Sequence, residues 1–137
     1  MNGSENWLSL DSLTDCIAVN TYMGYELAAP MSFWGATDEL RGDLTGGCGP
    51  GNIGDYFVPD TIYGLSVRPA CKIHDWCFAV WNDKPGFTLS NNIFKNNMIR
   101  INEQHKGPQW IKKLRLPRIK KYYQAVHFFG EPSYFNS

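Results

Sequence analysis

Residues 67–82 read VRPACKIHDWCFAVWN and predict a helix with one apolar face. The residues of that face are spaced alternately four and three apart: Val67, Cys71, His74, Phe78 and Trp81. Pro69 falls in the predicted first turn, where its missing N–H costs no intrahelical hydrogen bond. His74 therefore lies in the middle of an otherwise apolar stripe.

A second helix is predicted for residues 88–104, and a short turn, DKPG at residues 83–86, separates it from the first. Its stripe has one polar member and three apolar ones: Asn91, Phe94, Met98 and Ile101. Helices joined by so short a turn pack as antiparallel neighbours, so the two stripes should face each other. We expect His74 and Asn91 to be partners. A core histidine satisfied by an amide is the simpler interpretation, and the adjacent Asp75 favours a catalytic one.

The rest of the chain indicates a mainly α fold in a single domain, residues 1–137, because no segment alternates convincingly with period two. The 43% hydrophobic content is enough to bury a core. Residues 12–27 predict a weakly amphipathic helix, and the glycine-rich residues 31–64 predict a long loop. Residues 109–129 predict one or two short helices interrupted at Pro117.

The four cysteines predict two disulfide bonds. Cys71 and Cys77 lie six residues apart on one predicted helix, roughly 9 Å by helical rise, which is too far for a bond between them. Two connectivities remain: Cys48–Cys71 with Cys16–Cys77, or Cys16–Cys71 with Cys48–Cys77.

The first connectivity would hold the glycine-rich residues 46–52 beside Asp75. Backbone carbonyls turned toward one point, together with a carboxylate, are the oxygen ligands that calcium prefers.

The stretch CGPGN at residues 48–52, followed by CKIHDWC at residues 71–77, resembles the secreted phospholipase A2 superfamily. The loop is most similar to the insect-venom type, and the resemblance covers about residues 46–101. It implies two antiparallel, disulfide-stapled central helices with a calcium-binding loop.

Carried over residue by residue, the resemblance implies calcium bound by the carbonyls of Gly47, Gly49 and Gly51 and by the Asp75 carboxylate. His74 would be the general base for water that attacks the sn-2 ester of a glycerophospholipid, releasing a fatty acid and a lysophospholipid. The Gly49 N–H would stabilise the oxyanion together with calcium.

The chain departs from the family pattern at three positions. Asn91 stands where the family usually has Asp, so an amide oxygen would orient His74 and stabilise its imidazolium less. Phe78 stands where many members have Tyr. Ser90 stands where a cysteine usually bonds Cys77, so the partner of Cys77 is either Cys16 or no residue. The alternative function is a weak or inactive phospholipase-like protein that binds calcium and lipid.

Charge is divided along the chain: residues 1–60 carry a net charge of −8 and residues 61–137 carry +8. The positive part includes a basic stretch: Lys106, Lys112, Lys113, Arg115, Arg118, Lys120 and Lys121. A solvated helical face is the commonest reason for such a run. Beside a lipase-like site, Lys112, Lys113 and Arg115 are better interpreted as a patch for anionic phospholipid, with Trp110 at headgroup depth.

Several other functions are excluded or disfavoured. GPGNIG at residues 49–54 matches a dinucleotide fingerprint but follows no strand, and a zinc site on Cys71, His74 and Cys77 fails because these positions spiral round the helix. No nucleic-acid-binding fold is recognisable, so we expect no nucleic-acid partner. We expect a monomer that binds phospholipid membranes or micelles. His105 is expected to be a charge partner at a helix end, and His127 to be packed or exposed.

No membrane span or signal peptide is visible in the sequence. The predicted disulfides nevertheless indicate a secreted or extracytoplasmic destination.

Overall fold

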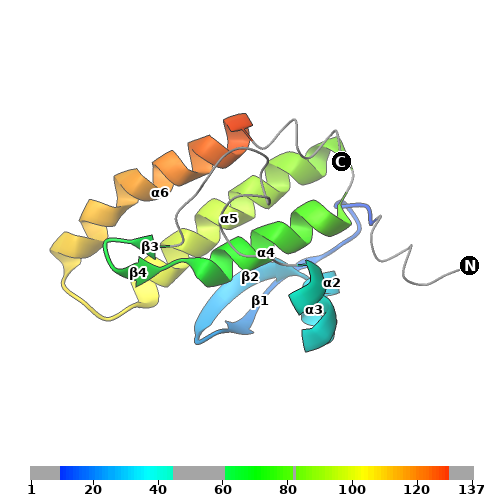
Figure 1. The fold of residues 1–137 in the computed structure, drawn as a ribbon, viewed down its shortest axis with the longest axis horizontal. Helices are drawn as coiled ribbons and strands as arrows, with labels where there is room; N and C mark the ends of the chain where they lie inside the picture. Colours follow the sequence, from blue (N-terminus) through cyan, green and yellow to red (C-terminus); the bar gives the residue numbers. More distant parts are fainter. Residues whose placement is uncertain (1–9, 45–60, 82, 130–137) are drawn as a thin grey trace, which may run out of the picture.

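A computed structural model describes residues 10–44, 61–81 and 83–129. Three helices lie side by side, each antiparallel to the next: α4 (Arg68–Val80), α5 (Lys84–Gln104) and α6 (Gln109–Phe129) (Figure 1). Helix α5 lies between the other two and also packs against the hairpin of β1 (Ile17–Tyr22) and β2 (Tyr25–Pro30). The smaller elements are α2 (Met31–Trp34), α3 (Asp38–Leu44), β3 (Thr61–Ile62) and β4 (Leu65–Ser66).

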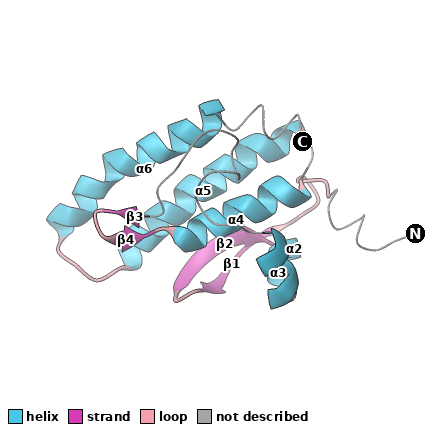
Figure 2. Ribbon diagram, viewed as in Figure 1, coloured by secondary structure: helices cyan, strands magenta, loops and turns pink. Residues whose placement is uncertain are grey.

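The predicted mainly helical fold and its two central helices are confirmed (Figure 2). Helix α5 begins at Lys84, four residues earlier than predicted, because Asp83 caps it: its carboxylate accepts the backbone N–H of Gly86 at 3.1 Å. Pro85 occupies the first turn, where proline is tolerated. The residues predicted as a separate turn therefore form the start of the helix.

The prediction that Pro117 interrupts residues 109–129 was wrong, since α6 is one helix of 21 residues with Pro117 inside it. Proline removes the hydrogen bond to the carbonyl four residues before it, here that of Lys113. Both residues are exposed, so water can satisfy that carbonyl.

The helix predicted for residues 12–27 was also wrong, because this segment forms most of the β1–β2 hairpin. Met23 and Gly24 form its turn with φ angles of 51° and 89°, a pair of positive values that suits a tight hairpin. Ile17 and Val19 point to the exposed side of β1. Their β-branched, period-two pattern indicates a strand. The packing of the partner strand β2 against α5 stabilises the hairpin.

The long loop predicted for residues 31–64 was wrong where the structure describes it. Two short helices, α2 and α3, directly follow β2, and Thr61–Ile62 pairs with Leu65–Ser66 as a small hairpin. Arg41 fixes this region, because its guanidinium donates to the backbone carbonyls of Phe33 and Trp34 at 2.8 and 3.1 Å. Residues 45–60 of the predicted loop lie outside the described residues.

The core is built from side chains of β2, α2, the β3–β4 hairpin and all three long helices. Its largest fully buried members are Trp76, Trp81, Phe33 and Phe94. Asp15 is the buried polar centre beside them: its carboxylate accepts the Ser32 N–H and hydroxyl and the Trp81 indole N–H at 2.6–3.0 Å. In the described part of the chain, no helix is both long and apolar enough to cross a membrane.

Candidate active site

Helix α4 places His74 against α5, as the two stripes predict. Val67, Cys71, His74 and Trp81 are buried, and Phe78 is half-buried. The side chain of His74 is 4% exposed. Pro69 stands at the start of α4, where the sequence places it.

The predicted partnership of His74 and Asn91 is confirmed. His74 Nε2 lies 2.8 Å from Asn91 Oδ1, between two adjacent antiparallel helices. An amide oxygen only accepts hydrogen bonds, so Nε2 carries the proton and Nδ1 is the nitrogen left to accept another. The amide therefore selects one tautomer of the imidazole.

Two aromatic rings enclose this imidazole. The Phe78 ring centroid lies 4.5 Å from that of His74, and the Phe94 centroid lies 4.8 Å from it. Burial lowers the pKa of His74 to about 4, while the hydrogen bond to Asn91 acts in the opposite direction. His74 is therefore neutral and able to act as a base at neutral pH.

Asn91 itself is fully buried and uses only part of its hydrogen-bonding capacity. Within the described residues its Nδ2 is buried and has no hydrogen-bond partner. A carboxylate in the same place would have no N–H to satisfy. This position therefore orients His74 through its oxygen alone.

Asp75 follows His74 on α4 and is half-buried, with Oδ2 shielded from solvent. A shielded carboxylate oxygen is a suitable ligand for a hard cation such as calcium. The other implied ligands, Gly47, Gly49 and Gly51, lie outside the described residues, as does the Gly49 N–H. The described residues contain no cluster of three or more His, Cys, Asp or Glu side chains that could hold a metal.

The sequence left Cys77 either bonded to Cys16 or unbonded, and the structure shows the second: both cysteines are free. Cys16 is exposed just before β1, whereas Cys77 is fully buried within α4. The alternative connectivity, Cys16–Cys71 with Cys48–Cys77, is excluded by the same two free thiols. Cys71 is disulfide-bonded, and Cys48 lies outside the described residues.

The other two histidines are placed away from Asn91. His105 follows the last residue of α5, and its Nδ1 lies 2.9 Å from the hydroxyl of Tyr25, so its partner is a hydroxyl and not a charge. His127 is half-buried on α6 and stacks on Phe87 and Tyr123, with ring centroids 5.6 and 5.8 Å away.

Arg115 does not belong to an exposed basic patch, contrary to prediction. It is 5% exposed, and its guanidinium donates to the carbonyls of Ile62 and Tyr63 and to Asn102 Oδ1 at 3.1–3.2 Å. Helix α6 turns this side chain inward, beneath the β3–β4 hairpin. Its role is to hold that hairpin against α5 and α6, which the charge pattern alone did not indicate.

A cavity of about 110 Å³ lies beside the same hairpin and contains no residue of α4 or α5. It is lined by Thr61, Ile62, Tyr63, Arg118 and Tyr122. This cavity is therefore separate from the His74–Asn91 pair.

Comparison of the chain with family models, with curated proteins and with solved structures finds no match.

Proposed function

We propose that this protein is a calcium-dependent phospholipase A2 that hydrolyses the sn-2 ester of glycerophospholipids. The observation that carries the proposal is the 2.8 Å contact between His74 and Asn91 across α4 and α5. The motifs at residues 48–52 and 71–77 also support the proposal, because they follow each other in the same order as in the resembled superfamily. The disulfide bond of Cys71 suits a secreted or extracytoplasmic protein.

In this mechanism His74 acts on water and no residue is acylated. The His74 Nε2–H is held by Asn91 Oδ1, which leaves Nδ1 to take a proton from water as its oxygen attacks the ester carbonyl. The same nitrogen then gives the proton to the departing glycerol oxygen. His74 does not have to lose a proton before it acts as the base, because burial keeps its imidazole neutral at neutral pH.

The fit to calcium depends on Asp75, whose half-buried carboxylate lies next to His74 on α4. It would hold the ion together with the carbonyls of Gly47, Gly49 and Gly51. When bound, calcium supplies polarisation of the ester carbonyl and, with the Gly49 N–H, stabilisation of the oxyanion.

The test is release of a labelled sn-2 fatty acid from a monomeric short-chain phosphatidylcholine, with calcium and with chelator. We expect release by the native protein with calcium only, and a loss of at least about a hundredfold for His74→Gln. His105→Gln is the matched control, because it changes a histidine that contacts Tyr25 and not Asn91. Equal release by native protein and His74→Gln, or release in chelator, refutes the mechanism. Calcium binding without release would favour the inactive lipid-binding alternative.

A further inference from the structure

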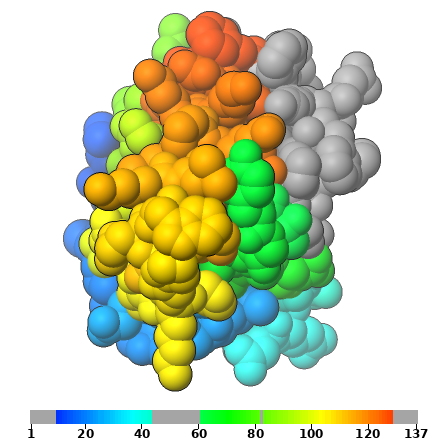
Figure 3. Space-filling view, turned by 90° about the vertical axis from the view of Figure 1, so that its left-hand side faces the viewer, coloured from blue at the N-terminus to red at the C-terminus, as the bar shows by residue number. Residues whose placement is uncertain are grey.

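Three of the exposed apolar side chains of helix α6 lie along one line, which we call the outer ridge: Trp110, Leu114 and Phe128. Their exposed fractions are 67%, 47% and 71%. The spacings of four and fourteen residues place all three on one face of the helix. Ile119 and Val126, which are buried, lie on the opposite face and anchor the helix to the core. Figure 3 shows α6 as a large part of one surface of the molecule, with the β3–β4 hairpin beside it.

Positive charges flank this ridge and have no ion-pair partner among the described residues. Helix α6 contains six Lys or Arg residues and no Asp or Glu. Four of them are exposed: Lys113, Arg118, Lys120 and Lys121. None of these four forms an ion pair with any described residue. The ridge is therefore both apolar and strongly cationic.

This combination suits an anionic lipid surface better than nucleic acid. An amphipathic helix lying in a membrane interface buries apolar and aromatic side chains, while its Lys and Arg side chains meet the headgroups. Tryptophan is favoured at that depth. Nucleic-acid backbones use the cations but leave exposed Leu and Phe unburied.

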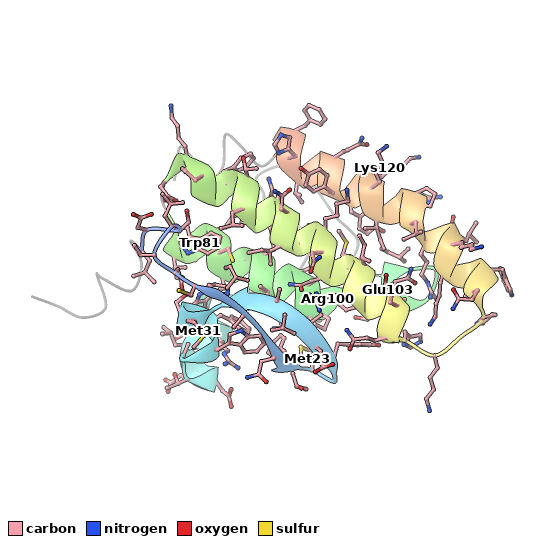
Figure 4. The ribbon with its side chains drawn as sticks, turned by 180° about the vertical axis from the view of Figure 1, so that it is seen from behind. Met23, Met31, Trp81, Arg100, Glu103 and Lys120 are labelled. Carbon is pink, nitrogen blue, oxygen red and sulfur yellow. The ribbon has the colours of Figure 1, made fainter. Side chains whose placement is uncertain are left out.

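Most of the other exposed apolar residues lie in an acidic part of the chain, and the exceptions are Leu116 on α6 and Tyr63 between β3 and β4. Val19, Met23 and Met31 are about half exposed on β1, its turn and α2. Residues 10–44 carry six Asp or Glu and one Arg. Figure 4 shows Met23 and Met31 on the side of the molecule opposite Lys120. An anionic surface would repel the first side and attract the second.

Aromatic contacts connect the C-terminal end of the ridge with the candidate active site. Ring centroids lie 5.8 Å apart for Phe128 and His127, 5.6 Å for His127 and Phe87, and 6.0 Å for Phe87 and Phe78. Phe78 then contacts His74. A surface bound at Phe128 is thus joined to the site by packed rings.

We infer that the outer ridge of α6, with its four flanking cations, docks on a bilayer of anionic phospholipid. Trp110, Leu114 and Phe128 enter the interface, and Lys113, Arg118, Lys120 and Lys121 lie against the phosphates. The biological use of this docking rests on the proposed function, since it brings the enzyme to its substrate, but docking itself needs neither calcium nor turnover.

The experiment measures binding of the native protein to phosphatidylglycerol and phosphatidylcholine vesicles in chelator, by vesicle sedimentation. We expect tight binding only to the anionic vesicles, weakened by high salt. Each Lys near an anionic surface contributes on the order of a fivefold change in partitioning, so Lys120→Glu with Lys121→Glu should reduce it about 25-fold or more. Trp110→Ala with Phe128→Ser should also reduce it.

The matched controls change the same charge and the same kind of surface elsewhere. Lys84→Glu with Arg100→Glu alters net charge equally on α5, and Val19→Thr with Met31→Ser removes exposed apolar groups from the acidic side. Both should bind nearly as well as native protein. Circular dichroism checks that every variant is folded.

Equal loss in controls and ridge variants, or no binding of native protein to phosphatidylglycerol, overturns the inference. Binding of duplex DNA that needs the same lysines, without vesicle binding, also overturns it. Since the hydrolysis assay uses monomeric substrate and the docking assay uses chelator, failure of one leaves the other result intact.

Discussion

Asn97 on α5 satisfies both backbone groups of Ala28 on β2: its Oδ1 accepts the Ala28 N–H, and its Nδ2 donates to the Ala28 carbonyl, each at 2.8 Å. Gln104 does the same for Glu26 at 2.8 and 2.9 Å. Asn97 and Gln104 are two turns apart on α5, and Glu26 and Ala28 are alternate residues of β2. Side chains of α5 thus satisfy backbone groups along the open edge of the hairpin, as a neighbouring strand would.

Removal of the Asn97 amide should therefore destabilise the fold. Asn97→Ala leaves a buried N–H and a buried carbonyl without partners, at a cost of about 2–4 kcal/mol in the free energy of unfolding. Urea unfolding followed by circular dichroism measures it. Asn96→Ala is the control, because Asn96 is exposed and its change should stay within about 0.5 kcal/mol. Equal effects of the two would contradict this account of β2.

The low pKa of His74 makes stability depend on pH. Its pKa is about 4 in the folded protein and 6.5 when unperturbed. At pH values between these two, His74 is protonated in the unfolded chain and neutral in the folded protein. The free energy of unfolding should decrease as pH falls from about 7 to about 4, by on the order of 3 kcal/mol from this group. Urea unfolding in chelator at several pH values, compared with His74→Gln, isolates the contribution. Parallel profiles for the two proteins would contradict it.

A carboxylate at position 91 should raise the pKa of His74. Asn91→Asp retains an oxygen for Nε2, and the group it removes has no partner among the described residues. The added negative charge stabilises the imidazolium, so the His74 pKa moves up from about 4. NMR titration of the His74 ring measures the shift. If the proposed mechanism holds, fatty-acid release should rise as well, whereas Asn91→Leu should lower it.

The hydrogen bonds that Arg115 donates to three acceptors, two of them buried, should contribute to stability. Arg115→Met leaves the carbonyls of Ile62 and Tyr63 and the Asn102 amide oxygen without this donor, so we expect a loss of about 2–4 kcal/mol. Thermal and urea unfolding measure it. Lys113→Met, an exposed change on the same helix, should leave stability near that of the native protein. A stable Arg115→Met protein would show that water replaces the guanidinium.

Thiol labelling tests whether Cys16 and Cys77 are free or joined to each other. Cys16 should react quickly with a maleimide in native protein, since it is exposed. Burial raises the pKa of the Cys77 thiol well above its usual value, so Cys77 should react only after unfolding. Mass spectrometry without reductant should then find two labelled cysteines. No labelled cysteine in denaturant would mean that Cys16 and Cys77 are joined.

The sequence by itself determined the helical pair and its polar contact. Spacings of three and four residues place His74 and Asn91 on facing stripes, and the short connection makes the helices antiparallel. These are local properties of the chain, which is why the His74–Asn91 partnership could be predicted without coordinates.

Only the tertiary structure decided the β1–β2 hairpin, the inward turn of Arg115 and the two free thiols. Each depends on groups distant in sequence: β2 needs Asn97 and Gln104, Arg115 needs the carbonyls of Ile62 and Tyr63, and Cys16 and Cys77 differ in burial. A residue's charge or strand propensity is visible in the sequence, but the partner that fixes its orientation arrives only when the chain folds, because burial requires every polar group to be satisfied at once.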